Sequence, residues 1–199
     1  MAIRKEVVPE WIAPRLRFKC LLCGECCRLY WVPLTHKDVV RISHKTGIPP
    51  QKFAVAVPKE AVGEWELPAF YLSGRREHYL ALKKRVDGFC FFVKLEGGKF
   101  VCSIYDVRPL TCRFYPYVYV PGKIVKLELL EDAVTFCPGV GRGPVYEPSR
   151  EAEAALAREA EMEEYRSIVA AWNALVLAGG VEPTFEKFLE FLLEGARRL

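Results

Sequence analysis

The stretch Cys20-Leu21-Leu22-Cys23-Gly24-Glu25-Cys26-Cys27 places four cysteines within eight residues of a 199-residue chain. Core packing does not account for so many thiols, because a small hydrophobic residue fills a core without the reactivity of sulfur. A Cys-x-x-Cys spacing lets one loop direct two sulfurs at a common centre, and the repeat Cys-x-x-Cys-x-x-Cys directs three. The stretch therefore predicts a metal centre.

The rest of the chain supplies four more cysteines, so that eight sulfurs make two sets of four. One predicted set joins three cysteines of the stretch to the most distant one, which a proline follows as in the bacterial ferredoxin run: Cys20, Cys23, Cys26 and Cys137. The fourth cysteine of the stretch is expected to point away from its neighbour and to serve another centre. The second predicted set is Cys27, Cys90, Cys102 and Cys112. A single four-sulfur site with the other thiols idle is the alternative.

Three kinds of sulfur chemistry compete for these residues. The triple spacing favours one or two 4Fe-4S iron–sulfur clusters. Structural zinc comes second, because zinc sites more often pair two Cys-x-x-Cys motifs and this chain has one dense motif. Disulfides come third, since a cytoplasmic compartment disfavours them and a bond between Cys26 and Cys27 would be strained. The three histidines lie away from the cysteines in sequence and are expected at the surface rather than as ligands: His36, His44 and His78.

Two arginines, Arg108 and Arg113, bracket Cys112 and are candidate cofactor-binding residues. In the first interpretation they pair with acids such as Asp106, or donate hydrogen bonds to a negatively charged centre. In the second they hold an anionic or carboxylate substrate beside that centre. The first interpretation is favoured.

Composition is that of an ordinary globular protein, with 51% hydrophobic and 27% charged residues. No succession typical of a signal peptide opens the chain, and the longest apolar run, near Ile168–Ala178, is too short to span a membrane. A cytoplasmic protein with no membrane partner is expected. Its only side-chain amides are Gln51 and Asn173, and this depletion, together with abundant charges, predicts a thermophilic source.

The formal charge of +4 treats the thiols as neutral. Two centres of four thiolates around a 2+ charge would each contribute about −2, which brings the sum to about zero. The sequence therefore does not support a nucleic-acid partner.

The fold class predicted is α+β: a small cysteine-rich metal-binding domain of antiparallel hairpins and short helices, capped by two C-terminal helices. Thr35 and Asp38 predict a helix start and Gly47 its end. Hairpins are predicted across Glu96-Gly97-Gly98 and Pro121-Gly122. Strands are expected near Leu67–Leu72, Tyr79 and Ala81, a helix capped by Ser149 and ended by Gly179-Gly180, and a last helix capped by Thr184. The expected division is an N-terminal arm at 1–17, the cysteine-cluster domain at 18–140 and the helical pair at 149–199.

The spacing of all eight cysteines, with the segment Arg108-Pro109-x-x-Cys112-Arg113, resembles the YkgJ-type CxxCxxCC cysteine-cluster family over roughly residues 18–138. The resemblance implies a zinc- or iron-chelating domain, and many members are labelled iron–sulfur oxidoreductases. A flagellin lysine N-methylase carries a related domain, so the resemblance also implies methyl transfer to protein. The chain shows no Gly-rich adenosylmethionine-binding loop after a strand.

The function expected is that of an iron–sulfur protein acting in electron transfer, or as an oxidoreductase-like or modifying enzyme component, with a redox or protein partner. The alternatives are a structural zinc module for protein or RNA interaction and a factor related to protein methyltransferases. Neither a Ser-His-Asp set nor a Walker loop nor a dinucleotide fingerprint is visible.

Overall fold

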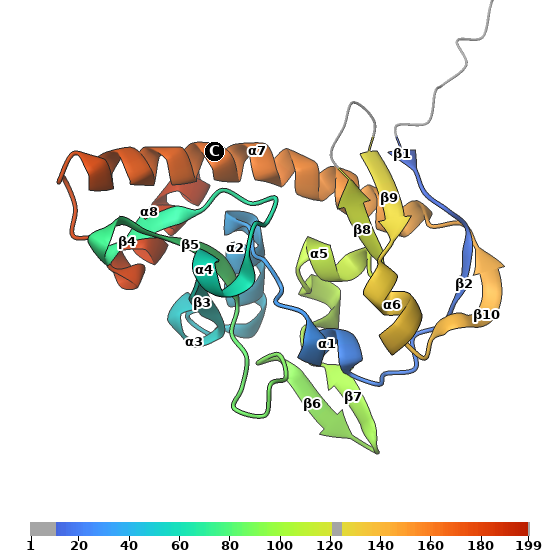
Figure 1. The fold of residues 1–199 in the computed structure, drawn as a ribbon. Helices are drawn as coiled ribbons and strands as arrows, with labels where there is room; N and C mark the ends of the chain where they lie inside the picture. Colours follow the sequence, from blue (N-terminus) through green and yellow to red (C-terminus); the bar gives the residue numbers. More distant parts are fainter. Residues whose placement is uncertain (1–10, 121–124, 199) are drawn as a thin grey trace, which may run out of the picture.

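The computed structural model describes residues 11–120 and 125–198. It is a mixed α+β structure of small two- and three-stranded sheets with two long C-terminal helices, as predicted (Figure 1). No helix in the described part of the chain is long and apolar enough to cross a membrane.

Two of the sheets described have three strands, and we call the one with the longer strands the larger sheet. It is antiparallel, in the order β3-β5-β4, with Ala81 opposite Val55 and His78 opposite Phe70. It confirms the strands expected in this region and adds one that the sequence analysis did not predict, β3. Its strands are β3 (Ala54–Pro58), β4 (Phe70–Leu72) and β5 (Arg76–Leu82). The short helical segments beside it are α3 (Pro50–Phe53), α4 (Lys59–Val62) and η1 (Ser73–Arg75).

Helix α2 (His36–Thr46) has both predicted ends. The Thr35 hydroxyl accepts a hydrogen bond from the Asp38 N–H at 3.1 Å, and the Asp38 carboxylate accepts one from the Thr35 N–H at 3.0 Å. Gly47 ends the helix in the left-handed conformation, with φ of 68°. The capping-box interpretation is confirmed.

Two predicted hairpins are also confirmed. Leu95 pairs with Phe100 in the first, and Tyr119 pairs with Leu127 in the second, whose turn at Pro121-Gly122 lies outside the described residues. Their strands are β6 (Val93–Glu96), β7 (Lys99–Cys102), β8 (Tyr117–Val120) and β9 (Val125–Leu129). Between them lie η2 (Tyr105–Val107) and α5 (Leu110–Arg113), and after them α6 (Glu131–Phe136).

The N-terminal region was expected to be an extended arm, and its residues 1–10 lie outside the described residues. The described part pairs with later strands. Strand β1 runs parallel to β9, and β2 runs antiparallel to β10, so that these segments are built into two of the sheets. The strands concerned are β1 (Trp11–Ile12), β2 (Leu16–Phe18) and β10 (Val140–Tyr146).

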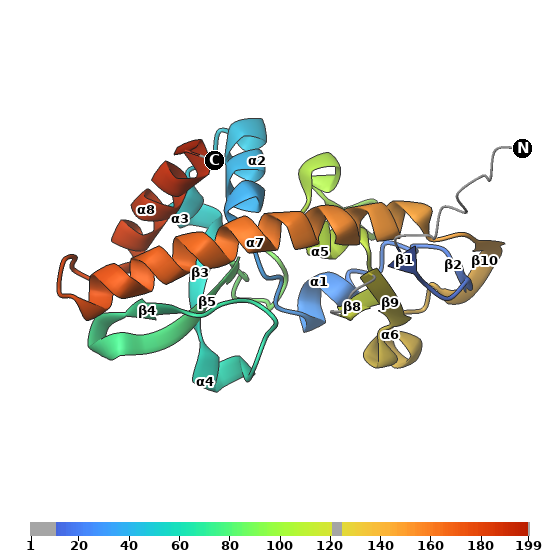
Figure 2. The same cartoon turned by 90° about the horizontal axis from the view of Figure 1, so that it is seen from above.

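Helix α7 (Ser149–Leu177) runs the length of the molecule in both views (Figures 1 and 2). The expected Ser149 cap is wrong: Ser149 is the first helical residue, Pro148 precedes it, and neither side chain caps the helix. The predicted cap of α8 (Phe185–Arg198) is confirmed, because the Thr184 hydroxyl accepts a hydrogen bond from the Lys187 N–H at 3.3 Å.

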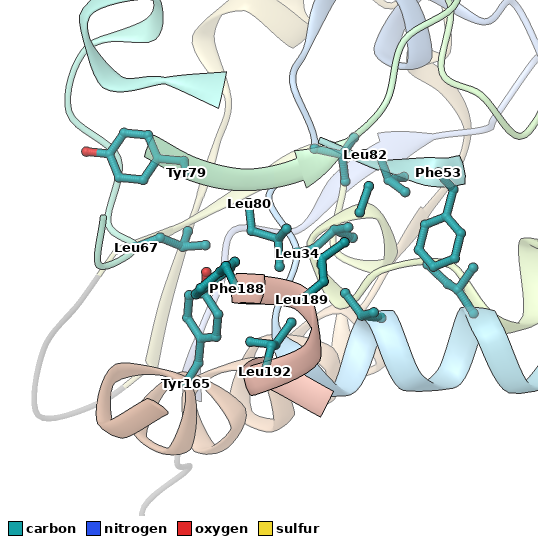
Figure 3. Packing of buried hydrophobic residues seen from close by; sticks show 14 of the residues in the cluster. Leu34, Phe53, Leu67, Tyr79, Leu80, Leu82, Tyr165, Phe188, Leu189 and Leu192 are labelled. Carbon is teal, nitrogen blue, oxygen red and sulfur yellow. The ribbon is translucent and has the colours of Figure 1, made fainter. Parts of the chain in front are cut away.

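The main hydrophobic core lies between the larger sheet, α2 and the two C-terminal helices (Figure 3). Phe188 of α8 stacks on Phe70 with ring centroids 3.7 Å apart. Trp172 contacts the Phe188 ring edge-on, with centroids 5.4 Å apart. Leu175 is 39% exposed, because Trp172 and Val176, one turn apart, occupy the buried face of α7.

A second, smaller core lies under the first half of α7. Small residues there, including Ala152 and Ala155, let the helix approach the side chains of Phe114, Tyr117 and Leu127. One helix thus joins two cores, and α5, with Cys112, packs directly against it.

His36 corrects the expectation that the histidines lie at the surface: it is 0% exposed, whereas His44 is exposed and His78 half-buried. Its Nε2 lies 3.1 Å from the Glu164 carboxylate, and its ring stacks on Tyr165. Burial lowers the pKa of His36, an effect that outweighs the opposing influence of Glu164.

We expect the free energy of unfolding to decrease as the pH falls below the ordinary histidine range. The folded-state pKa of His36 lies below the unfolded one, so the unfolded chain binds more protons in that range and gains stability relative to the folded chain. Urea unfolding at about pH 7.5 and about pH 5.5 measures the slope. His36→Gln should reduce it, while the exposed control His44→Gln should not. Equal slopes in all three proteins would contradict the assignment.

Candidate metal centre

The cysteine stretch folds as a loop followed by a short helix, α1 (Glu25–Leu29). Gly24 opens the helix with φ of +77°, and a Cβ placed there would lie 2.7 Å from a ring carbon of Phe100. Only glycine therefore fits this position without displacing the ring. The Leu22 carbonyl accepts a hydrogen bond from the Phe100 N–H at 2.9 Å, so the loop is fastened to β7.

Cys26 and Cys27 both lie on α1, and their sulfurs are 3.8 Å apart. The expectation that Cys27 points away from Cys26 is wrong. Neighbouring side chains point in opposite directions on an extended segment, whereas on a helix such as α1 they are separated by only about 100°.

Four cysteines pack against the main hydrophobic core. Cys90 is 8% exposed, and its N–H donates to the Cys27 carbonyl at 2.9 Å. Cys102 faces Val93 across the β6–β7 hairpin, and the Val93 N–H donates to the Cys90 carbonyl at 3.1 Å. Cys112 comes from α5. We name these the core-side cysteines: Cys27, Cys90, Cys102 and Cys112.

The other four lie outside both described hydrophobic cores, and we name them the loop-side cysteines: Cys20, Cys23, Cys26 and Cys137. The Lys19 N–H donates to the Gly139 carbonyl at 3.1 Å. A Cβ on Gly139 would lie 2.3 Å from the Lys19 carbonyl oxygen, so glycine permits this close approach. The contact brings the segment of Cys20, which is exposed, beside the segment of Cys137.

The electrostatic neighbours of the thiols follow this division only in part, because Cys26 acts on thiols of both sets. Burial raises the pKa of Cys23, and the charges of Cys137, Cys26 and Cys20 raise it further. On the other side, burial raises the pKa of Cys90 to about 11, with Cys102 and Cys26 contributing.

Cys26 lies within the influence of both sets. Burial raises the pKa of Cys112 well above the ordinary thiol range, and the charges of Cys90, Cys26 and Cys102 add to the effect. The pKa of Cys26 itself is lowered, chiefly by the hydrogen bond from the Cys27 thiol. The structure thus places Cys26, rather than Cys27, between the two sets.

The donor chemistry fits a soft metal. In the described residues no three or more Cys, His, Asp or Glu side chains form a group that could hold a metal ion in the present side-chain positions. All eight donors considered are thiols, which select zinc and iron–sulfur centres over harder cations. The ligand type therefore fits zinc or iron.

Arg108 lies beside the thiols. Its guanidinium sits over the Tyr105 ring at 3.8 Å. Burial raises the pKa of Cys102, and the charge of Arg108 opposes this rise. The hydrogen bond with Cys27 lowers the pKa of Cys26, and the charge of Arg108 acts in the same direction. The Arg108 Nε is buried with no hydrogen-bond partner among the described residues. A buried donor of this kind is costly unless a partner meets it.

Arg113 has a different environment. Its Nε donates to the Arg108 carbonyl at 3.1 Å and its Nη2 to the Asp106 carbonyl at 2.9 Å. The expected pairing with Asp106 is thus made to the backbone rather than to the carboxylate. Arg113 therefore stabilises the turn that presents Arg108 and Cys112.

Two tyrosines, Tyr30 and Tyr115, lie beside the loop-side cysteines. Tyr30 packs on Tyr115 with ring centroids 6.1 Å apart, and the Tyr30 hydroxyl is buried without a partner in the described part of the chain. Burial, and then Cys137, raises the pKa of Tyr115. In the sequence, only the position of Tyr30 three residues after Cys27 indicates that it lies near the thiols. This indication is weak, because the direction of the Tyr30 side chain depends on α1.

A polar network fixes the segment that carries Cys112. The Asp38 carboxylate, buried at the start of α2, accepts a hydrogen bond from the Leu110 N–H at 3.2 Å. From the other side, the Arg158 Nε of α7 donates to the Thr111 hydroxyl at 3.2 Å. The sequence pattern indicates only the capping role of Asp38. It does not predict the Asp38–Leu110 and Arg158–Thr111 hydrogen bonds, because they join residues far apart in the chain.

Small sheets, a short cysteine-bearing helix and eight thiols define a cysteine-cluster protein of the metal-chelating class. The chain belongs to the CxxCxxCC family, described as "Putative zinc- or iron-chelating domain", whose model matches residues 19–138. It is also similar to "Uncharacterized protein MJ0661" of Methanocaldococcus jannaschii, with 32% identity over 130 residues. That alignment covers 64% of this chain and 60% of the relative. No solved structure matches the chain.

Proposed function

We propose that the protein holds metal at two four-cysteine centres, that these are iron–sulfur clusters, and that it acts in electron transfer or as a redox component of an enzyme. One observation carries the proposal: four cysteines pack against the hydrophobic core and four lie outside it. This division supports the two predicted sets. A bound iron–sulfur cluster would supply one-electron chemistry.

The neighbouring residues suit a negatively charged centre. Arg108 carries a buried, unpaired N–H in the described structure and acts on sulfurs of both sets. Hydrogen bonds to cluster sulfurs tune such centres. In this proposal Arg108 donates to the centre, and Arg113 positions it through the backbone of the turn. Arg108 thereby keeps the cofactor-binding role expected from the sequence, whereas Arg113 takes a positioning role.

Structural zinc is the second candidate. Thiols of the kind found at the core-side cysteines also hold zinc, which stabilises small domains outright. In that case the surface, rather than the metal, would carry the interaction with a protein partner.

Metal analysis of anaerobically purified protein separates the two candidates. We expect a brown protein with iron and acid-labile sulfide in near-equal amounts, and a reversible redox couple. The control is the same protein unfolded in guanidinium in the presence of a chelator, which should lose the colour. Colourless protein with stoichiometric zinc would overturn the iron–sulfur proposal, and the lack of a redox couple would overturn electron transfer.

A further inference from the structure

We propose that the two centres differ in how readily they release metal: the core-side centre keeps its metal until the protein unfolds, whereas the loop-side centre exchanges its metal with thiols and chelators in solution. Cys20 is the ligand that an incoming thiol or chelator displaces. The inference rests on the proposed function only in that both sets bind metal, whether iron or zinc.

Release from the core-side centre would require several elements to separate. Its cysteines come from α1, the segment before β6, the end of β7 and α5. These elements are joined by the Cys90–Cys27 and Val93–Cys90 backbone hydrogen bonds, and α5 is fixed by Asp38 and Arg158. All four side chains contact the main core. Opening such a site approaches the cost of global unfolding.

The loop-side centre is held differently. Residues 19–24 form neither helix nor strand, and Cys20 is the one exposed cysteine of the eight. Among the described backbone contacts, the loop is fastened by the Lys19–Gly139 and Phe100–Leu22 hydrogen bonds. Cys137 directly follows Phe136, which is 51% exposed.

Local opening of this loop leaves both hydrophobic cores intact, because none of the loop-side cysteines belongs to them. Irregular surface segments open at a small fraction of the cost of unfolding. An incoming thiol or chelator therefore reaches the metal from the side of Cys20. Cys23, close to α1, and Cys26, on α1, still hold the metal at that stage.

The experiment follows metal loss from the full-length protein as purified, incubated anaerobically with EDTA. Metal that stays with the protein is measured by elemental analysis after desalting, and circular dichroism follows the fold at the same times. We expect two phases of similar amplitude. The fast phase should leave the spectrum unchanged, and the slow phase should keep pace with unfolding and accelerate with added guanidinium.

Cys20→Ser tests the assignment of the fast phase, since an exposed side chain is replaced without disturbing a core. The fast phase should accelerate about 10- to 100-fold, or its metal should be missing from the start, with the slow phase unchanged. Lys19→Ser, in the same loop, is the control and should alter neither phase.

A single phase of metal loss would overturn this inference, and so would a slow phase accelerated by Cys20→Ser. A protein that holds metal at only one centre would overturn it as well. These outcomes are distinct from failure of the iron–sulfur proposal, because biphasic release of zinc would leave the inference standing.

Discussion

Cys112→Ser is expected to remove the core-side metal and to destabilise the whole protein. Cys112 lies on α5, which packs against α7 and contacts the main core. Metal binding by thiolates contributes about 10 kcal/mol to the folding of small domains, so losing one of four ligands should cost about 5 kcal/mol or more. That corresponds to a fall in Tm of about 10–20 °C.

Thermal unfolding followed by circular dichroism, with metal content measured on the same samples, checks this result. Cys20→Ser is the matched control, because it replaces a cysteine outside the cores. It should melt close to the unsubstituted protein. A Cys112→Ser protein that melts with the Cys20→Ser protein would show that the core-side set is not a structural centre.

Asp38→Ala is expected to lower the free energy of unfolding by about 3–5 kcal/mol. Asp38 is 1% exposed. Its carboxylate caps α2, pairs with Arg41 and accepts a hydrogen bond from the Leu110 N–H. Its pKa is raised by burial, with Arg41 opposing the shift, so the carboxylate depends on these partners. Alanine removes one of the two carboxylates that pair with the partly buried Arg41, which keeps Glu161, and it leaves two backbone donors without their acceptor.

Urea unfolding measures this loss, and the exposed Asp106→Ala provides a matched control from the cysteine-bearing segment. Asp38→Asn should fall between the two, because the amide oxygen still accepts from the backbone while the charge opposite Arg41 is lost. The EDTA experiment should also show faster loss of core-side metal in Asp38→Ala, since α5 loses an anchor. Equal stability of Asp38→Ala and Asp106→Ala would contradict this role.

Local patterns were sufficient for much of the fold. The reciprocal bonds of Thr35 and Asp38 and the stop at Gly47 involve residues close in sequence, and the hairpin at Glu96-Gly97-Gly98 depends on its own turn. The Ser149 cap failed because Pro148 already occupies the capping position of α7. The sequence pattern at a helix start cannot distinguish two adjacent residues that could each occupy the capping position.

The burial of His36 and the inward turn of Asp38 toward Leu110 depended on packing between segments more than 70 residues apart. Such contacts are set by the way α2, α5 and α7 meet, which no short window of sequence contains.

The sequence by itself determined that this chain is a cysteine-cluster protein, because ligand type and loop spacing are local properties that survive in any fold. It also fixed the family, through the cysteines and the Arg108-Pro109-x-x-Cys112 segment. Only the tertiary structure decided that Cys26 and Cys27 share a helix, that Cys20 is exposed, and that four of the eight cysteines face the core. Burial is a property of what packs around a residue, and here that packing comes from α7 and its neighbours.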